Sequence, residues 1–314
     1  MEKIFRRATL EDREGVLSLS PDLYFGRDYL PHMYDSVIRE YRGYVCEENG
    51  TIIGFGMISI VDGGETATRR GGRVLESHQG QGVFRDLSDY MTRDLYTIPN
   101  MKYSTMTINK KHFDLSRSYI NRENYKLVMK IMIMLVNYNI SDLQVTSSPV
   151  NNIVITEIDR DLFATILNCK PSRDYLFPEK FVRIHCVLYR PSMENLEHFL
   201  NEERYVVGSY GEKQRRPESI RLLTLASFFP CKVGTAYQID IFGDKIEDFH
   251  AHLCLHFKKI STITKSFATS GIMFGMDMNI ELIKSAFRQF NIASPGDTAF
   301  ELSAYRKTLY EHSE

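Results

Sequence analysis

Cysteine is scarce in this sequence, and its few occurrences form no recognisable pattern. The 314 residues include five cysteines with no C-x-x-C pair and no zinc-like spacing: Cys46, Cys169, Cys186, Cys231 and Cys254. We therefore expect reduced thiols, mostly in the core, of an intracellular protein. No cluster of His, Cys and Asp has the spacing of metal ligands, so no metal is expected.

Long apolar runs and an excess of charge of one sign are also absent. No run approaches the roughly 18–20 residues of a membrane span, and the first residues, MEKIFRRATLEDRE, are too charged for a signal peptide. The formal net charge is −1, which gives no general attraction to nucleic acids or membranes. We expect a cytoplasmic protein without such partners. The sequence does not indicate an oligomeric state.

The length of 314 residues and the 43% hydrophobic content predict about two domains. The first half alternates short strands with amphipathic helices, and its Asn49-Gly50 pair indicates a hairpin turn. In chain order we expect a strand at residues 4–5, a helix capped by Thr9, an aromatic segment at 22–34, strands on both sides of the turn, a strand at 65–75, a helix from 83, a strand at 101–109, a helix at 113–121 and an apolar strand at 126–138.

The second half begins after the Ser-Ser-Pro at residues 147–149 and again mixes strands with helices. Expected strands lie at 152–156, 181–189, 222–228, 236–242 and 271–276, with helices at 193–200, 244–257 and 280–290 and a turn-rich segment at 202–217. No second glycine loop occurs. This half is therefore either a degenerate second copy of the first unit or an unrelated α+β extension.

The most informative stretch is residues 72–96, in which a short strand runs into a loop with Gly80 and Gly82 and then directly into a helix. A glycine-bearing turn at a helix N-terminus binds anions, because the first N–H groups lack partners and the helix dipole adds positive potential. The loop has no Lys-Ser/Thr and no G-x-G-x-x-G, which excludes the common nucleotide loops. The alternative is a corner whose glycines only turn the chain.

This stretch resembles motif A of the GNAT acetyltransferase superfamily, (Q/R)-x-x-G-x-(G/A). Gln79 and Gly82 match, whereas Phe84 stands where the superfamily usually has Gly or Ala. The segments DLYFGRDYLPHMY (22–34), VDGGETATRRGGRVLESHQGQGV (61–83) and INRENYKLVMKIMIM (120–134) resemble its histidine N-acetyltransferase branch. The resemblance covers most of residues 1–140 and, more faintly, the rest. It implies an α/β (α+β) GNAT fold at 1–140 and a degenerate GNAT-like domain at 150–314.

The resemblance also implies acetyl-CoA as the co-substrate. The main-chain groups of Val74 and Leu75 are expected to hold its pantetheine arm, like an added strand. The loop N–H groups are expected to bind its pyrophosphate. They belong to Gln79, Gly80, Gln81, Gly82, Val83 and Phe84.

Acetyl transfer also needs a proton acceptor for the amine and a proton donor for the leaving thiolate. Candidates for the base are Glu65, Glu76 and His78, of which Glu76 directly follows the strand before the loop. The superfamily's acid tyrosine aligns with Ile120. Its neighbour Tyr119 is rotated from that place by about 100° on the helix, so it serves only if the helix is turned. The structural alternative is that these side chains form surface ion pairs or pack.

Asp28, Tyr29 and Arg70 are the candidate acceptor-binding residues. Asp28 and Tyr29 belong to the D-Y-L-P segment that the histidine-acetylating branch also has. Arg70 stands where that branch tends to carry an acidic residue, which favours an anionic group such as a carboxylate. Alternatively, Arg70 faces solvent. The nearby aromatics either wall a pocket or form the core of a lid: Tyr24, Phe25, Tyr29 and Tyr34.

Two functions follow from these patterns. The first is an N-acetyltransferase that moves an acetyl group to a small amine, such as the α-amine of histidine or another amino acid, by direct attack in a ternary complex. The alternative is a non-catalytic acyl-CoA-binding or regulatory module, which Phe84 and the displaced tyrosine favour. An enzyme for protein N-termini or lysines is a weaker third interpretation, because the second half would close one side of an open groove.

Overall fold

The computed structural model describes residues 2–21, 23–110, 113–145, 153–211, 215–292 and 299–309. It divides into two compact units. Unit 1 consists of Met1–Val128 together with Ala304–Glu314, and unit 2 consists of Met129–Ser303. The predicted end of the second domain at residue 314 therefore differs from this division, because the last residues belong to unit 1. The expected boundary at 147–149 lies outside the described residues.

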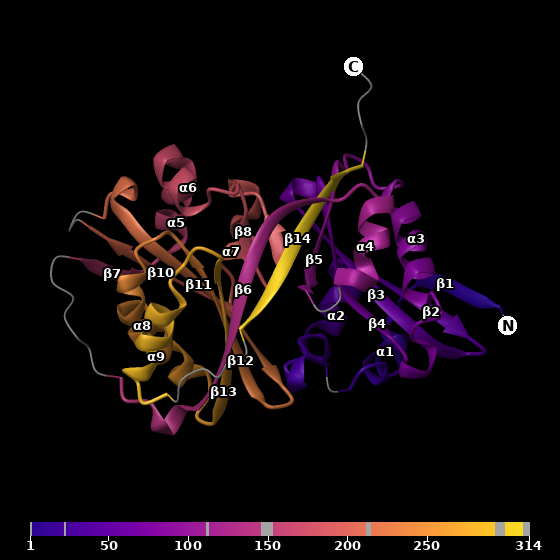
Figure 1. Ribbon diagram of the computed structural model, residues 1–314, viewed down its shortest axis with the longest axis horizontal. Helices are drawn as coiled ribbons and strands as arrows, with labels where there is room; N and C mark the ends of the chain where they lie inside the picture. The colour runs from indigo at the N-terminus through magenta and orange to yellow at the C-terminus, as the bar shows by residue number, and fades with distance from the viewer. Residues whose placement is uncertain are drawn as a thin grey trace, which may run out of the picture. The chain divides into compact units, whose positions relative to one another are not determined.

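Unit 1 is built on a mainly antiparallel sheet in which β4 and β5 are parallel (Figure 1). Its strands are β1 (Lys3–Arg7), β2 (Arg42–Glu48), β3 (Thr51–Val61), β4 (Thr66–Val74), β5 (Tyr103–Asn109), the first residues of β6 (Lys126–Asn139) and the last of β14 (Phe300–Thr308). Its helices are α1 (Arg13–Ser18), α2 (Leu30–Glu40), α3 (Val83–Leu95) and α4 (Phe113–Arg122). The order β1-β2-β3-β4-β5 confirms the succession expected from the sequence.

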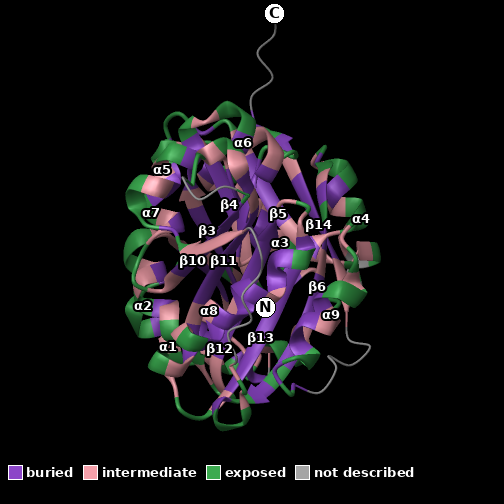
Figure 2. Ribbon diagram, turned by 90° about the vertical axis from the view of Figure 1, so that its left-hand side faces the viewer, coloured by how far each residue is buried: buried purple, intermediate pink, exposed green. Residues whose placement is uncertain are grey.

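Each face of the unit 1 sheet is covered by helices because successive strand residues point to opposite sides. Tyr44 and Cys46 of β2 pack against α3, whereas Val45 between them packs against α1 and α2. The helices place apolar residues on one side only, so the sheet is buried in Figure 2 while the outer helix faces are exposed. The hairpin turn at Asn49-Gly50 is confirmed, with positive φ at both residues.

Unit 2 repeats the strand order of unit 1. Its strands are β7 (Val154–Glu157), β10 (Arg204–Tyr210), β11 (Ile220–Cys231), β12 (Gly234–Phe242) and β13 (Phe267–Gly275), in that order in the sheet, followed by β6. The first four are antiparallel neighbours, and β12 and β13 are parallel, as β4 and β5 are. Helices α5 (Arg160–Asn168) and α6 (Lys170–Leu176) follow β7, α8 (Phe249–Ile263) links β12 to β13, and α9 (Ile280–Arg288) follows β13.

Two predicted elements of unit 2 were wrong. The single strand expected at 181–189 is a hairpin of β8 (Val182–Ile184) and β9 (Val187–Tyr189), because His185 and Cys186 adopt positive φ and form its turn. It precedes α7 (Leu196–Phe199). The segment expected to be turn-rich at 202–217 contains β10, which is buried along most of its length. Because β10 contains a glycine and hydroxyl-bearing residues and is buried on both faces, its sequence lacks the alternation of apolar and polar residues that indicates a strand.

A polar chain runs through the core of unit 2 between α8 and the sheet. The Thr224 hydroxyl lies 2.8 Å from both His252 Nδ1 and His256 Nε2, and the Tyr237 hydroxyl lies 2.9 Å from His256 Nδ1. Burial lowers the pKa of His252 to about 3 and also lowers the pKa of His256. Both rings are therefore neutral, and Thr224 has only one proton to share between them.

No helix in the described ranges has the length and apolarity needed to cross a bilayer.

These histidines predict acid sensitivity. A histidine pKa that falls from about 6.5 unfolded to about 3 folded stabilises the fold above pH 6.5, and this stability is lost as the pH falls toward 3. At pH 5.5 the loss is about 1.4 kcal/mol per histidine. Urea denaturation at pH 7.5 and 5.5 should show a smaller acid-induced loss for His252→Asn than for the wild type. His32→Asn, at an exposed position, should behave like the wild type, and an equal loss in all three proteins would contradict the assignment.

Candidate acyl-CoA site

The glycine loop lies at the N-terminus of α3, as the sequence predicts. Gly82 is the N-cap residue with φ of 79°, and Gly80 has φ of 76°, values that side-chain-bearing residues rarely adopt. The first N–H groups of a helix have no intrahelical partners, and here the loop leaves Gly80 and Gln81 exposed. The exposed Arg85 side chain lies beside Gly82, within 2.9 Å of where a Cβ would stand. The corner therefore offers the first N–H groups of α3 to an anion. The Gln79 N–H, in contrast, already donates to Glu76 O at 3.2 Å, and Arg85 is hydrogen-bonded to Asp86 at 3.1 and 3.0 Å.

Phe84 packs on the backbone of Gly72 in β4. A Cβ added to Gly72 would lie 2.5 Å from Phe84 Cζ, closer than real atoms approach. The ring remains 44% exposed. The ring of Phe84, which departs from the family pattern, thus occupies the space that Gly72 leaves by having no side chain. Phe84 lies over the strand and not across the mouth of the loop.

The parallel strands β4 and β5 stay paired over only part of their length. Thr66–Arg69 pair with Tyr103–Met106, and within the described residues the pairing goes no further, although β4 continues to Val74 and β5 to Asn109. Opposite β3 the register of β4 shifts at Gly71 and Gly72, which form a bulge across from Gly56. A gap whose edges are main-chain groups therefore opens between the two strands and points toward the loop.

The main-chain groups of Val74 and Leu75 have partners within the protein. The Leu75 N–H donates to Ile53 O at 2.9 Å, and Val74 O accepts a hydrogen bond from the exposed Gln79 side chain at 3.2 Å. An amide nitrogen already occupies the place expected for a pantetheine amide. Because Gln79 is exposed, it can be displaced at little cost.

The acceptor-binding candidates Asp28, Tyr29 and Arg70 come together on the face of β4 opposite to the one on which Phe84 packs. Asp28 accepts two hydrogen bonds from Arg73, at 2.8 and 2.7 Å, with side chains 11% and 0% exposed. Asp28 is therefore the buried partner of Arg73 and also accepts from the Leu30 N–H at the start of α2. The Arg70 guanidinium lies over the Tyr29 ring, 4.9 Å from its centroid. Tyr29 and Arg70 form a wall beside the gap, and Asp28 holds that wall to β4.

The aromatic segment before Asp28 divides into core and surface. Tyr34 is fully buried and donates to Thr9 O at 2.7 Å, so it belongs to the core. Tyr24 and Phe25 have φ of 54° and 58°, and Phe25 is 80% exposed. Positive φ at two successive aromatic residues is strained and is found mostly at functional sites.

The base candidates lie around the loop. Glu76 is exposed, and no described side chain bonds or ion-pairs with its carboxylate. His78 lies between Ser77, at 2.9 Å, and Glu48, at 3.3 Å. Glu65 forms an ion pair with Lys102. A histidine that is hydrogen-bonded to a carboxylate can still accept a proton, so these contacts do not decide between Glu76 and His78 as the base.

Tyr119 lies at the opposite end of the gap from Glu76. Its hydroxyl is buried near Thr92, and its ring lies near Arg69, the last residue of β4 that pairs with β5. Arg69 donates a hydrogen bond to Thr92 Oγ1 at 2.6 Å. Thr92 lies about 14 Å along α3 from Val83, the first residue of that helix, so this contact is far from the glycine loop. Burial raises the pKa of Tyr119 to about 12, although Arg69 opposes the shift. Tyr119 therefore keeps its proton, and it stands where the strands part.

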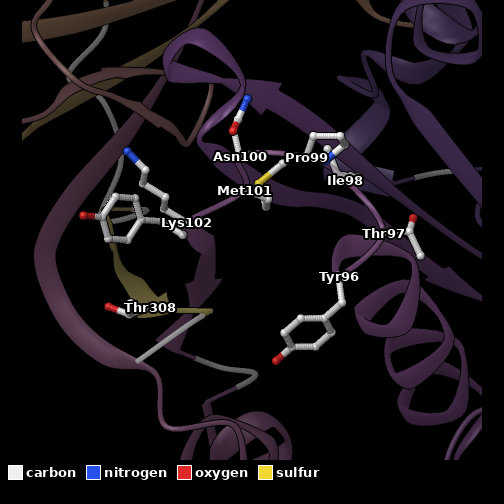
Figure 3. A pocket seen from close by; sticks show the side chains of 9 residues that line it. Tyr96, Thr97, Ile98, Pro99, Asn100, Met101, Lys102 and Thr308 are labelled. Carbon is white, nitrogen blue, oxygen red and sulfur yellow. The ribbon is translucent and has the colours of Figure 1, made fainter. Parts of the chain in front are cut away.

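A cavity of about 440 Å³ lies elsewhere in unit 1 (Figure 3). It is lined by residues 96–103, after the C-terminal end of α3, and by Thr308. The 13 residues of α3 separate it from the glycine loop by about 20 Å, so it is not part of the site. In the described parts of the chain, no group of three or more His, Cys, Asp or Glu side chains is arranged to hold a metal ion.

Sequence reasoning missed Arg73 as the partner of Asp28, and it missed Arg69. Arg73 and Asp28 are 45 residues apart, so no local spacing joins them. Arg73 is one of three arginines in β4, and the sequence alone does not tell which of them has a buried partner. A cation buried there requires a carboxylate partner.

Comparison with known proteins shows which families this chain resembles. Residues 14–95 match the acetyltransferase (GNAT) family, and residues 152–274 match the family described as histidine N-acetyltransferase, C-terminal. The chain is 33% identical over 142 residues to a histidine N-acetyltransferase of Xenopus tropicalis, covering 44% of this chain and 42% of that protein. It is 27% identical over 213 residues to the probable N-acetyltransferase 16 of Homo sapiens, covering 60% and 54%. The matches thus span about half the length of these relatives.

Solved structures share the fold over the whole chain. A tandem GNAT protein from the clavulanic acid biosynthesis pathway aligns with a TM-score of 0.58 and 11% identity, covering 99% of this chain and all of that one. A GCN5-related N-acetyltransferase from Sphaerobacter thermophilus aligns with a TM-score of 0.60 and 10% identity, covering 99% and 97%. These identities show the fold alone. They confirm a GNAT fold with a second GNAT-like domain.

The contact between Phe84 and Gly72 predicts a double-mutant coupling. Gly72→Ala should lower the free energy of unfolding by about 1–3 kcal/mol, because its methyl group displaces the ring. In a Phe84→Ala background the same change should cost much less, giving a coupling above about 0.5 kcal/mol in urea denaturation. Gly211→Ala, where a Cβ meets nothing closer than 3.7 Å, is the control. Additive effects of Gly72→Ala and Phe84→Ala would show that the ring does not lie on Gly72.

Proposed function

We propose that this chain, which carries a GNAT acetyltransferase domain followed by a histidine N-acetyltransferase C-terminal region, transfers an acetyl group from acetyl-CoA to the amine of a small molecule. The observation that carries the proposal is the parting of β4 from β5 beside a glycine loop at a helix N-terminus. The first feature offers main-chain partners to an extended amide arm, and the second offers donors to a diphosphate. We assign these roles to residues 1–140 and propose 150–314 as a degenerate copy.

On this proposal the donor lies along β4. The N–H groups from Gly80 to Phe84 bind the pyrophosphate, because the Gln79 N–H already donates to Glu76 O at 3.2 Å. Arg85, which is hydrogen-bonded to Asp86, lies beside Gly82. The pantetheine amides take the place of Gln79 at Val74 O and extend toward Arg69. Phe84 lies on Gly72 along this path and forms one wall of it.

The acceptor approaches from the face of β4 on which the Arg70 side chain lies over the Tyr29 ring. Arg70 suits a carboxylate, and an amino acid brings a carboxylate next to its amine. The similarity to the histidine N-acetyltransferase of Xenopus tropicalis makes histidine the first acceptor to test. Asp28 is a positioning residue on this proposal, because Arg73 already occupies both of its oxygens.

Two proton transfers accompany the reaction. The amine nitrogen bonds to the acyl carbon, the carbon–sulfur bond breaks, and the amine loses a proton as the thiolate gains one. Tyr119 keeps a proton at neutral pH and stands where the strands part, which suits the acid. Glu76 lies beside the loop at the pyrophosphate end, roughly 20 Å along the strand from Arg69, so we assign the amine proton to solvent water and not to Glu76. The α-amine itself ionises near neutral pH, so a modest base suffices.

The alternative, a non-catalytic acyl-CoA-binding module, is favoured by one observation. The Tyr119 hydroxyl is buried beside Arg69 and Thr92, between α3 and α4. If that burial persists when the donor binds, the chain holds a thioester without a proton donor for the thiolate. Donor binding without turnover would identify this case.

Acetyl-CoA should stabilise the protein through the loop. At a hundredfold excess over Kd, binding adds about 2.7 kcal/mol, which raises the Tm by several degrees. Gly82→Asp should abolish the rise, because its carboxylate repels the pyrophosphate. Gly82→Asn is the matched control, since Asn has the same size and tolerates positive φ as Asp does. Differential scanning fluorimetry measures all three proteins, and no shift of the wild type at millimolar acetyl-CoA would refute the donor assignment.

The acceptor assignment predicts thiol release with one or a few of the twenty amino acids. Arg70→Glu should change the ranking of kcat/KM among them toward cationic acceptors, because it reverses the charge of the wall beside Tyr29.

Arg70→Gln is the control that removes the charge without reversing it, and it should slow all carboxylate-bearing acceptors alike. An unchanged ranking in Arg70→Glu would remove Arg70 from the acceptor site. Turnover on none of the twenty, with donor binding intact, would favour the binding module.

A further inference from the structure

The second unit contains the counterpart of the gap in unit 1. Its parallel strands β12 and β13 pair from Thr235–Ala268 to Asp240–Met273, and within the described residues no later pair is formed. Asp240 is therefore the last residue of β12 that pairs with β13, as Arg69 is the last residue of β4 that pairs with β5. Both β12 and β13 continue for two residues beyond, and α8 links them as α3 links β4 to β5.

In unit 2 a side chain fills that place. Arg183 Nη2 donates to Ile241 O on β12 at 2.7 Å and lies 3.5 Å from Met273 O on β13. The same guanidinium lies 4.9 Å from the centroid of the Phe242 ring. A group that contacts main-chain oxygens on both strands stands between them. It makes the kind of contact that an extended amide arm would make in unit 1.

The hairpin that delivers Arg183 has no counterpart among the described residues of unit 1. In unit 1, α2 leads directly to β2, whereas in unit 2 the β8–β9 hairpin is inserted between α6 and α7. Its turn at His185 and Cys186 is tight, with positive φ at both residues. The insertion places Arg183, in the middle of β8, against the end of the β12–β13 pairing.

The buried ion pair with Asp240 keeps the Arg183 side chain in this place. Arg183 Nε lies 3.3 Å from Asp240 Oδ1, with side chains 5% and 0% exposed, and the other Asp240 oxygen is buried without a partner. Burial raises the pKa of Asp240 to about 7, against the opposing pull of Arg183. Withdrawing the guanidinium would leave an uncompensated polar group in the core, which is strongly unfavourable.

The loop before α8 also lacks the features of an anion site. Where unit 1 has Gln79 to Gly82 followed by Arg85, unit 2 has a single glycine, Gly243, followed by Lys245 among three carboxylates, Asp244, Glu247 and Asp248. Asp248 is held by Ser209 and Arg221, both at 2.8 Å. Carboxylates at this helix N-terminus repel a diphosphate.

We propose that Arg183 occupies the donor gap of unit 2 as a fixed internal plug, so that each chain binds a single acyl-CoA, in unit 1. The inference rests on the proposed function for the site in unit 1. The plug itself is a property of unit 2 alone.

Isothermal titration with acetyl-CoA tests the number of sites. The wild type should bind one equivalent per chain, Gly82→Asp none, and Gly82→Asn one equivalent with lower affinity. Two equivalents in the wild type, or one equivalent retained by Gly82→Asp, would overturn the inference. No binding by the wild type would overturn the proposed function instead, and the plug would then be decided by the second test.

The second test does not involve acetyl-CoA. Arg183→Ala should lower the Tm, and methylguanidinium at tens of millimolar should restore part of that loss by entering the vacated gap. Arg190→Ala, which removes an arginine just after the same hairpin, should show no such recovery, and methylammonium at equal ionic strength should not replace methylguanidinium. If Arg183→Ala does not fold alone, the yield of folded protein on refolding with and without methylguanidinium gives the same readout. No selective recovery would overturn the plug.

Discussion

The early end of the pairing between β4 and β5 is the constraint on which the rest of unit 1 depends. Parallel strands that stay paired present no main-chain groups to a ligand, because the ladder uses all of them. Here the ladder ends at Arg69 and Met106, and the bulge at Gly71 and Gly72 re-aims β4 just beyond that point. The glycine loop, the packing of Phe84 and the ion pair of Asp28 are all arranged around this one opening.

The two units show that one strand order can hold a gap or close it. Both have an antiparallel set of strands followed by a parallel pair that parts before its end. In unit 1 the edges of the gap meet the glycine loop and the exposed side chain of Gln79, which a ligand can displace. In unit 2 they meet Arg183. Removing its side chain would leave the buried carboxyl group of Asp240 without its partner. A fold alone therefore does not decide whether a site exists. The side chains inserted at one position do.

Much of this was readable from sequence where the determinants are local. The hairpin at Asn49-Gly50, the glycine loop and the amphipathic α3 each follow from a few adjacent residues, and all are present. The misses have non-local causes. The partner of Arg73 is 45 residues away, the turn at His185 and Cys186 lacks glycine, and β10 is buried on both faces and so shows no alternation. The orientation of Tyr119 depended on how α4 packs, which a residue count cannot give.

The last strand has a consequence for how unit 1 can exist. Tyr305 packs with Met106, Ile120 and Tyr125, and Leu309 belongs to the core under α3, with its N–H bonded to Lys102 O. Residues 1–128 thus complete their core only with residues 304–309, which are synthesised much later. A ribosome-bound or proteolytic fragment that stops near residue 140 would lack those side chains and expose the surfaces they cover. Unit 1 is a domain in space without being one uninterrupted stretch of the gene product.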